Sequence, residues 1–228
     1  MRTLRSIALA GVLLGCAGTA AATPIAISTF DTGDEGWTVG HFFSTFSEPP
    51  PPTFVGSGGN PGGFIRTDDR FDWTSFHAPA EFLGNKLGAY GASLSFDERV
   101  ASSDLNAVYP MVVISNTGYA LELQFRTSAP ASGSTGPWTH FLIPLVASAG
   151  WEICDAGCQA GSGLAGLAAT EEQLQAVLSD LLFLHVDADW LTGPNDLTDL
   201  DNVIMTPEPS SWLLLGGGLV LAYRLRRR

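Results

Sequence analysis

The chain has 228 residues and a formal net charge of −12 at pH 7, from 23 acidic and 11 basic residues. Between residues 23 and 206, five basic residues stand against 22 acidic ones. Such an acidic surface argues against a nucleic acid or an anionic lipid as partner, because both need Lys and Arg to neutralise phosphate. An acidic surface is compatible with divalent cations and with neutral or cationic polymers as partners. The segment from residue 23 to residue 206 is long enough for one domain with a sizeable core.

The first 22 residues are predicted to be a secretory signal peptide with a short helix. Arg2 and Arg5 form a positive start, residues 7–14 are apolar, and residues 20–22 are three alanines that suit cleavage. An alternative is a lipobox at residues 13–16, which would attach lipid to Cys16. With either reading, the folded body is expected at residues 23–206.

The first half of the body is predicted to hold short strands separated by turns. Residues 32–36 have turn chemistry, and the four prolines at 49–52 predict a loop or polyproline segment. The glycine-rich residues 56–63 are expected to continue that loop. The predicted strands are residues 25–30, 37–43, 64–67 and 71–76.

The second half adds more strands and one helix. Leu121, Leu123 and Phe125 alternate with polar residues, which predicts a half-buried antiparallel strand. Thr170 begins a capping box with Gln173. Apolar residues then recur at helical spacing through Leu182, so a helix of about three turns is expected to lie against or close one end of the sheets. The predicted strands are residues 92–100, 109–114, 119–125, 138–144, 182–189 and 201–205, with a hairpin turn at 115–118.

Many short strands with one capped helix predict a mainly β fold, an antiparallel β-sandwich. If the signal peptide removes Cys16, then Cys154 and Cys158 remain. In an oxidising compartment this pair is predicted to form a disulfide that closes a small loop. A redox pair or a zinc site is a weaker alternative, because the spacing is three residues and no His lies nearby.

The end of the chain is a short motif, an apolar run and a basic end. Pro207, Glu208 and Pro209 precede apolar residues 212–223, and the chain closes with Arg224, Arg226, Arg227 and Arg228. Residues 211–225, about 15 residues, would cover roughly 22 Å as a helix, less than the bilayer core of about 30 Å. The arginines would stay cytoplasmic, so the tail predicts transient contact with the inner membrane.

This order resembles the PEP-CTERM tail of Gram-negative bacterial surface proteins, with Thr206 where the family often has Val. The resemblance implies that residues 207–228 are a sorting segment. An exosortase-type enzyme would recognise the motif and release or transfer the protein during export. We therefore expect an inner-membrane-anchored intermediate, followed by the cell surface or extracellular matrix. The alternative is an ordinary C-terminal anchor.

The body resembles the laminin IV type A domain, also called laminin B. The residues that carry this resemblance are Phe30-Asp31, Gly36-Trp37, Phe82-Leu83-Gly84, Lys86, Tyr90-Gly91, Leu94, Phe96, Trp138, Pro144-Leu145, Gly150-Trp151, the capped helix and Leu200-Asp201-Asn202-Val203. The resemblance implies a jelly-roll-like sandwich, an extracellular setting and no known catalysis. The proline- and glycine-rich loop at residues 48–63 has no counterpart in it.

Candidate chemistry is sparse. Residues 161–166 match the letters of a dinucleotide-binding glycine loop, but no strand directly precedes them and the helix starts later with its own cap. The histidines, His41, His77, His140 and His185, are scattered. Asp97 and Glu98 should point to opposite faces of one strand. Asp187 and Asp189 share a face, but no second element is evident for a glycosidase pair. We therefore expect no catalytic residues and no enzyme.

A calcium site is the more specific hypothesis. Acidic and amide side chains gather at residues 31–35 and 195–202, and the first and last strands of jelly-roll sandwiches often run side by side. Asp31 would then approach Asp201 and offer hard oxygen ligands to Ca²⁺. The alternative is that these are turn residues on a solvated face, without any cofactor.

These patterns predict a non-enzymatic exported protein with a structural or adhesive role in exopolysaccharide. The alternative is a carbohydrate-binding module, with or without calcium, that would stack exposed aromatic rings on sugars. Most of the tryptophans of the body are nevertheless expected in the core; they are Trp37, Trp73, Trp138, Trp151 and Trp190.

Overall fold

The computed structural model describes residues 23–41, 50–68, 70–71, 73–100, 111–117, 121–127, 137–154, 166–190 and 197–208. Several predictions therefore lie outside the described residues. They concern the signal peptide at 1–22 with Cys16, Cys158, the glycine run at 161–165, Pro209, and the apolar tail with Arg224, Arg226, Arg227 and Arg228.

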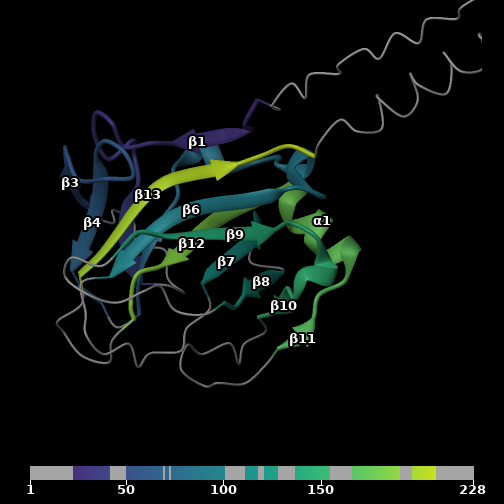
Figure 1. Cartoon of the computed structure of the whole chain (residues 1–228). Helices are drawn as coiled ribbons and strands as arrows, with labels where there is room; N and C mark the ends of the chain where they lie inside the picture. The colour runs from purple at the N-terminus through teal and green to yellow at the C-terminus, as the bar shows by residue number, and fades with distance from the viewer. Residues whose placement is uncertain are drawn as a thin grey trace, which may run out of the picture.

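Two antiparallel sheets make up the described body (Figure 1). The six-stranded sheet has the order β3 (Thr53–Val55), β4 (Phe64–Asp68), β13 (Leu197–Met205), β6 (Ser93–Val100) and β9 (Thr139–Pro144), and β1 (Ala26–Ser28) also pairs with β13. The seven-stranded sheet has the order β11 (Leu167–Ala168), β10 (Glu152–Ile153), β8 (Glu122–Phe125), β7 (Val112–Asn116), β12 (Leu181–Asp187), β5 (Thr74–His77) and β2 (Thr38–His41).

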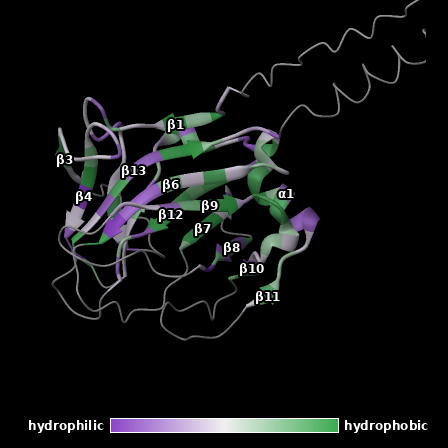
Figure 2. Cartoon of the chain, viewed as in Figure 1, coloured by the Kyte–Doolittle hydropathy of each residue, from purple (hydrophilic) through white to green (hydrophobic). Residues whose placement is uncertain are grey.

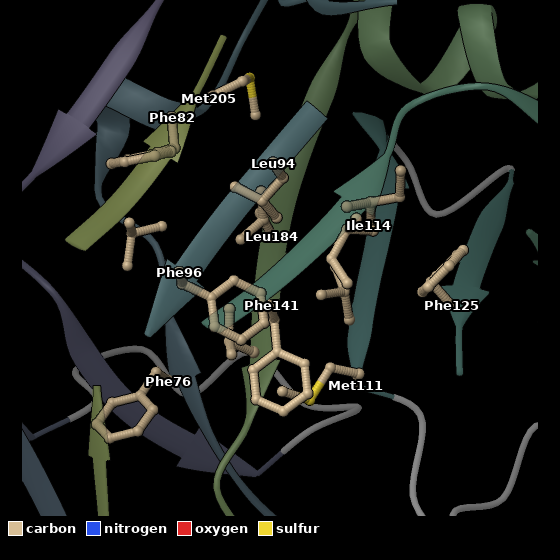
Figure 3. Packing of buried hydrophobic residues seen from close by; sticks show 14 of the residues in the cluster. Phe76, Phe82, Leu94, Phe96, Met111, Ile114, Phe125, Phe141, Leu184 and Met205 are labelled. Carbon is tan, nitrogen blue, oxygen red and sulfur yellow. The ribbon is translucent and has the colours of Figure 1, made fainter. Parts of the chain in front are cut away.

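Alternate residues of both sheets point into one shared core (Figure 3). Leu94 and Phe96 of β6 and Phe141 of β9 lie in the same cluster as Ile114 of β7 and Leu184 of β12. Burial of each such side chain contributes about 1.5–3 kcal/mol relative to exposure. The mainly β sandwich predicted from the sequence is confirmed.

Three tryptophans are part of this core, as expected. Trp37, Trp151 and Trp190 are each at most 2% exposed. A buried indole N–H needs an acceptor, and each finds one. Trp37 donates to Ser28 Oγ over 3.0 Å, Trp151 to the Pro144 carbonyl over 2.9 Å, and Trp190 to Glu98 Oε1 over 2.7 Å.

Helix α1 (Glu171–Ser179) starts with the predicted capping box. The Gln173 N–H donates to Thr170 Oγ1 over 3.3 Å, and the Thr170 N–H donates to Gln173 Oε1 over 2.8 Å. The helix lies at the end of the sandwich away from β3 and β4 (Figure 1). It is shorter than predicted, because Leu181 and Leu182 belong to β12 instead. No helix in the described part of the chain is long and apolar enough to cross a membrane.

The structure corrects several predicted boundaries. Strand β3 lies inside the predicted proline-glycine loop, and the short strands β10 and β11 were not predicted. The hairpin between β7 and β8 is present, although β7 continues through Asn116. Strand β8 was predicted to be half-buried, but Gln124 on its polar face is 1% exposed. Both faces of β8 are therefore covered at that position.

Candidate functional site

The most elaborate polar region lies along one edge of β13. On this edge β4 pairs with residues 197–200 and β1 with residues 203–205, so neither strand covers Asp201 and Asn202. Asn202 has a left-handed backbone (φ 51°), which Asn tolerates better than most residues. On the other edge, the pairing of β13 with β6 shifts register between Asp201 and Ile204. The resulting bulge leaves Asn202 and Val203 without register partners on β6, directly after the pair of Asp201 with Asp97.

A glycine-rich loop fills the gap. The Asn60 N–H donates to Asp201 Oδ2 over 2.6 Å, and Asn202 Nδ2 donates to the Asn60 carbonyl. A Cβ on Gly59 would lie 2.7 Å from Asp201 Oδ2, and a Cβ on Gly62 would collide with Asp31 Oδ1. Because only glycine leaves room for these carboxylates, the loop can pack directly on them.

Asp97 and His140 extend this region across the six-stranded sheet. In the strand register Asp201 is opposite Asp97, and Asp97 is opposite His140. Asp97 Oδ1 lies 2.7 Å from His140 Nδ1, while Asn60 Nδ2 and Asn202 Nδ2 donate to Asp97 Oδ2 over 3.2 and 2.9 Å. Figure 2 shows hydrophilic stretches in the adjacent strands β6 and β13. We call Asp31, Asp97 and Asp201, with the loop at residues 58–63, the acidic site.

Burial raises the pKa of Asp201 to about 6. The N–H groups of Asn60 and Asn202 oppose this rise by stabilising the carboxylate, whereas the charges of Asp97 and Asp31 add to it. The carboxyl group thus exchanges its proton near neutral pH. An added cation would favour its ionised form.

The predicted calcium residues have different positions. Asp31 and Asp201 both contact the loop, through Gly62 and Gly59. Asp34 instead accepts the Gly36 N–H over 3.0 Å in a local turn, and Asn195 and Asp196 lie outside the described residues. Among the described residues, no group of three His, Cys, Asp or Glu side chains is arranged to hold a metal ion. A Cβ on Gly59 would meet both the Gly63 carbonyl oxygen and Asp201 Oδ2, so these two oxygens face the same side of Gly59.

An arginine pair borders the acidic site. Arg66 and Arg99 both bind Asp199, with Arg99 Nη2 2.6 Å from Asp199 Oδ2. The Arg99 guanidinium also lies 4.3 Å from the ring of Trp138, and both side chains donate to the Gly58 carbonyl. Trp138 is thus a partly exposed ring fixed beside the loop, not a core residue. The sequence alone did not indicate this cluster, because its members lie on three strands and a loop.

The outer face of the seven-stranded sheet forms a second polar region. The strand registers place Glu152, Gln124, Val113, His185, His77 and Thr38 in one row across six strands. The rings of His77 and His185 stack with centroids 3.7 Å apart, and Phe183 stacks on His185 at 4.3 Å. Burial lowers the pKa of His77 to about 4; a hydrogen bond with the main chain of His41 opposes this shift, and the charge of His41 adds to it.

The histidines are therefore less scattered than the sequence indicated. His77 and His185 are opposite each other on paired strands, and His41 packs against Trp73 with ring centroids 5.2 Å apart. The lone pair of an imidazole nitrogen lies in the plane of its own ring, and the planes of two stacked rings run side by side without meeting. Such a pair does not converge on one metal ion.

The carboxylates considered for catalysis are buried. Asp187 and Asp189 do meet a second element, since the charge of Glu98 acts on Asp187, but Glu98 and Asp187 are 0% exposed and Asp189 is 4% exposed. Burial raises the pKa of Asp187 well above its usual range, and Glu98 and Asp189 add to the rise. Asp187 Oδ2 has no hydrogen-bond partner. Almost none of the surface of these three residues is open to solvent.

The remaining predicted positions are at the ends of strands. Cys154 follows β10 and is 6% exposed, and its predicted partner Cys158 lies outside the described residues. The disulfide stays a prediction. Pro207 and Glu208 follow β13 after a single residue, and the Glu208 N–H donates to the Gly88 carbonyl over 3.1 Å.

Two known families match this chain, one over the folded body and one over the C-terminal tail. The laminin B (domain IV) family matches residues 75–208, and the PEP-CTERM protein-sorting motif matches residues 206–228. The sorting motif marks the chain as an exported substrate that passes the membrane. A search of curated proteins found no match.

Solved structures with a similar fold include the L4b domain of human laminin alpha-2, with 15% identity and a TM-score of 0.61 over 82% of this chain and all of that one. The CBM22-1 xylan-binding domain of Paenibacillus barcinonensis Xyn10C has 12% identity and a TM-score of 0.47 over 84% of this chain and 99% of that one. CtCBM11 has 13% identity and a TM-score of 0.43, covering 77% and 98%. Since the family match spans more than half of the residues, the chain belongs to the laminin B (domain IV) family.

Proposed function

We propose that this protein is an exported surface protein whose laminin B domain has a structural or adhesive role in an exopolysaccharide matrix. An exosortase-type enzyme would process the tail during export. The observation that carries the proposal is the direct junction of the two matches, because the sorting motif begins where the last strand of the sandwich ends. The burial of Glu98, Asp187 and Asp189 also favours a role without catalysis.

A second candidate is a carbohydrate-binding module that depends on calcium, and the acidic site favours it. Asp31 and Asp201 would hold Ca²⁺ together with main-chain oxygens of the loop. The ion would neutralise the repulsion between these carboxylates and stiffen the loop that fixes Trp138. Trp138 and the exposed ring of His140 would then offer a surface on which a sugar ring can stack.

A glycan array with the mature domain, residues 23–208, separates the two candidates. Calcium-dependent carbohydrate binding predicts signals that disappear with EDTA and weaken as the pH falls through 6, because protonation of Asp201 competes with the ion. Asp201→Asn and Asp31→Asn should lose both the signals and the calcium-induced rise in melting temperature.

Glu35→Gln is the matched control. It removes the same charge from an exposed residue near Asp31, so calcium and glycan binding should stay at the wild-type level. Binding to no glycan, with or without calcium, would remove the second candidate and leave the structural role. Loss of binding in the Glu35→Gln variant would show instead that overall charge, rather than the acidic site, is responsible.

A further inference from the structure

The folded domain extends into its own sorting motif. Thr206 continues the pairing beyond β13: its N–H donates to the Ser93 carbonyl over 3.0 Å, and its hydroxyl donates to the same oxygen over 3.1 Å. Ser93 Oγ also lies 3.2 Å from Thr206 Oγ1. Residue 206 is therefore held by both its main chain and its side chain.

Glu208 of the motif is bound as well. Its N–H donates to the Gly88 carbonyl in the 3-10 helix η2 (Leu87–Ala89). Its side chain lies close to Gly91, so that a Cβ there would be 3.2 Å from Glu208 Cγ and Cδ. Pro207 between them has no N–H to donate. Two consecutive N–H donors of the segment, at residues 206 and 208, are thus both bound by the domain.

This docking limits the space around the motif. Trp212, where the apolar run begins, comes four residues after Glu208, and an extended chain spans at most about 13–14 Å over four residue steps. A membrane enzyme must take up the motif in its active site. When Glu208 is bound to Gly88, the domain lies directly against the motif on its N-terminal side. On its C-terminal side, the apolar run that would enter the membrane begins within this short distance of Glu208.

We propose that the laminin B domain masks its own sorting motif, and that release of residues 206–208 from Ser93 and Gly88 limits processing by the exosortase-type enzyme. The inference rests on the processing proposed above. The partner that the masking excludes is that enzyme. The surface of the domain that masks the motif consists of Ser93, Gly88 and Gly91. Processing then depends on a local opening of the last residues of the fold, while the sandwich itself stays intact.

The test follows conversion of the full-length precursor in bacteria that carry the enzyme, by pulse labelling. Thr206→Val keeps the shape of the side chain but removes its hydrogen bonds to Ser93. Loss of these hydrogen bonds should raise the open fraction, and with it the processing rate, at least about fivefold. Thr206→Ser keeps the hydroxyl and should be processed at the wild-type rate. A six-residue Gly-Ser insertion between Thr206 and Pro207 should accelerate processing at least as much as Thr206→Val.

Two further measurements keep the outcomes distinct. Hydrogen exchange of the purified precursor in detergent should show protection of the Glu208 amide in the wild type and loss of protection in Thr206→Val. Equal processing rates for the wild type, Thr206→Val and the insertion would overturn the masking. If neither the wild type nor the insertion is converted, and Glu208→Ala behaves like both, then the proposed processing itself fails.

Discussion

His77 is the residue whose protonation the fold restricts most clearly. Burial lowers its pKa to about 4, whereas an unfolded chain binds the proton near pH 6.5. The stability it contributes is therefore present above pH 6.5 and is lost as the pH falls towards 4. The full loss is about 3 kcal/mol.

Urea unfolding of the wild type and of His77→Gln between pH 7.5 and 4.5 measures this loss. The difference in unfolding free energy between the two proteins should shrink as the pH falls. His140→Gln is the control, since the side chain of His140 is 62% exposed. A difference that stays constant with pH would contradict the restriction at His77.

At the residue scale, the sequence identified those members of the acidic site that lie among other acidic residues along the chain. Asp31 and Asp201 stood out because acidic residues gather near each end of the body. Asn60, Asp97 and His140 did not, because only the pairing of β6, β9 and β13 brings them together. Asp97 and Glu98 were predicted to point to opposite faces of one strand, and Glu98 indeed points inward, where it accepts a hydrogen bond from Trp190.

At the scale of elements, the loop at residues 58–63 makes the sharpest prediction. A Cβ on Gly59 would collide with the main chain at Gly63 and approach Asp201 Oδ2. Gly59→Ala should therefore reduce the unfolding free energy by about 1–3 kcal/mol, the usual range for overpacking. Gly33→Ala is the matched control, because nothing lies within 4 Å of a Cβ there. Equal losses in both variants, measured by urea unfolding, would contradict the close packing of the loop.

Element boundaries were harder to predict than element types. Leu181 and Leu182 continue the helical spacing, yet the chain leaves the helix at Asp180 and pairs Leu181 with Asn116. Tertiary pairing thus overrides local periodicity at this point. Strand β3 was missed for a similar reason, since its three residues pair with β4 within a segment that prolines and glycines dominate.

At the scale of the whole molecule, the two sheets share one core. Large side chains from both sheets belong to the same cluster (Figure 3). We therefore expect residues 23–208 to unfold in a single cooperative transition. Tryptophan fluorescence, to which all five tryptophans of residues 23–208 contribute, should give the same midpoint as far-UV circular dichroism. Separate midpoints would show that the sheets unfold independently.

The position of β13 also sets the order in which the protein can fold. This strand lies in the interior of the six-stranded sheet, with β6 on one side and β4 and β1 on the other, yet it is the last strand among the described residues. During export with the N-terminus leading, β1, β4 and β6 would emerge before their common partner. The sheet can therefore close only after almost the whole body has crossed, so the fold is completed only as the sorting motif arrives.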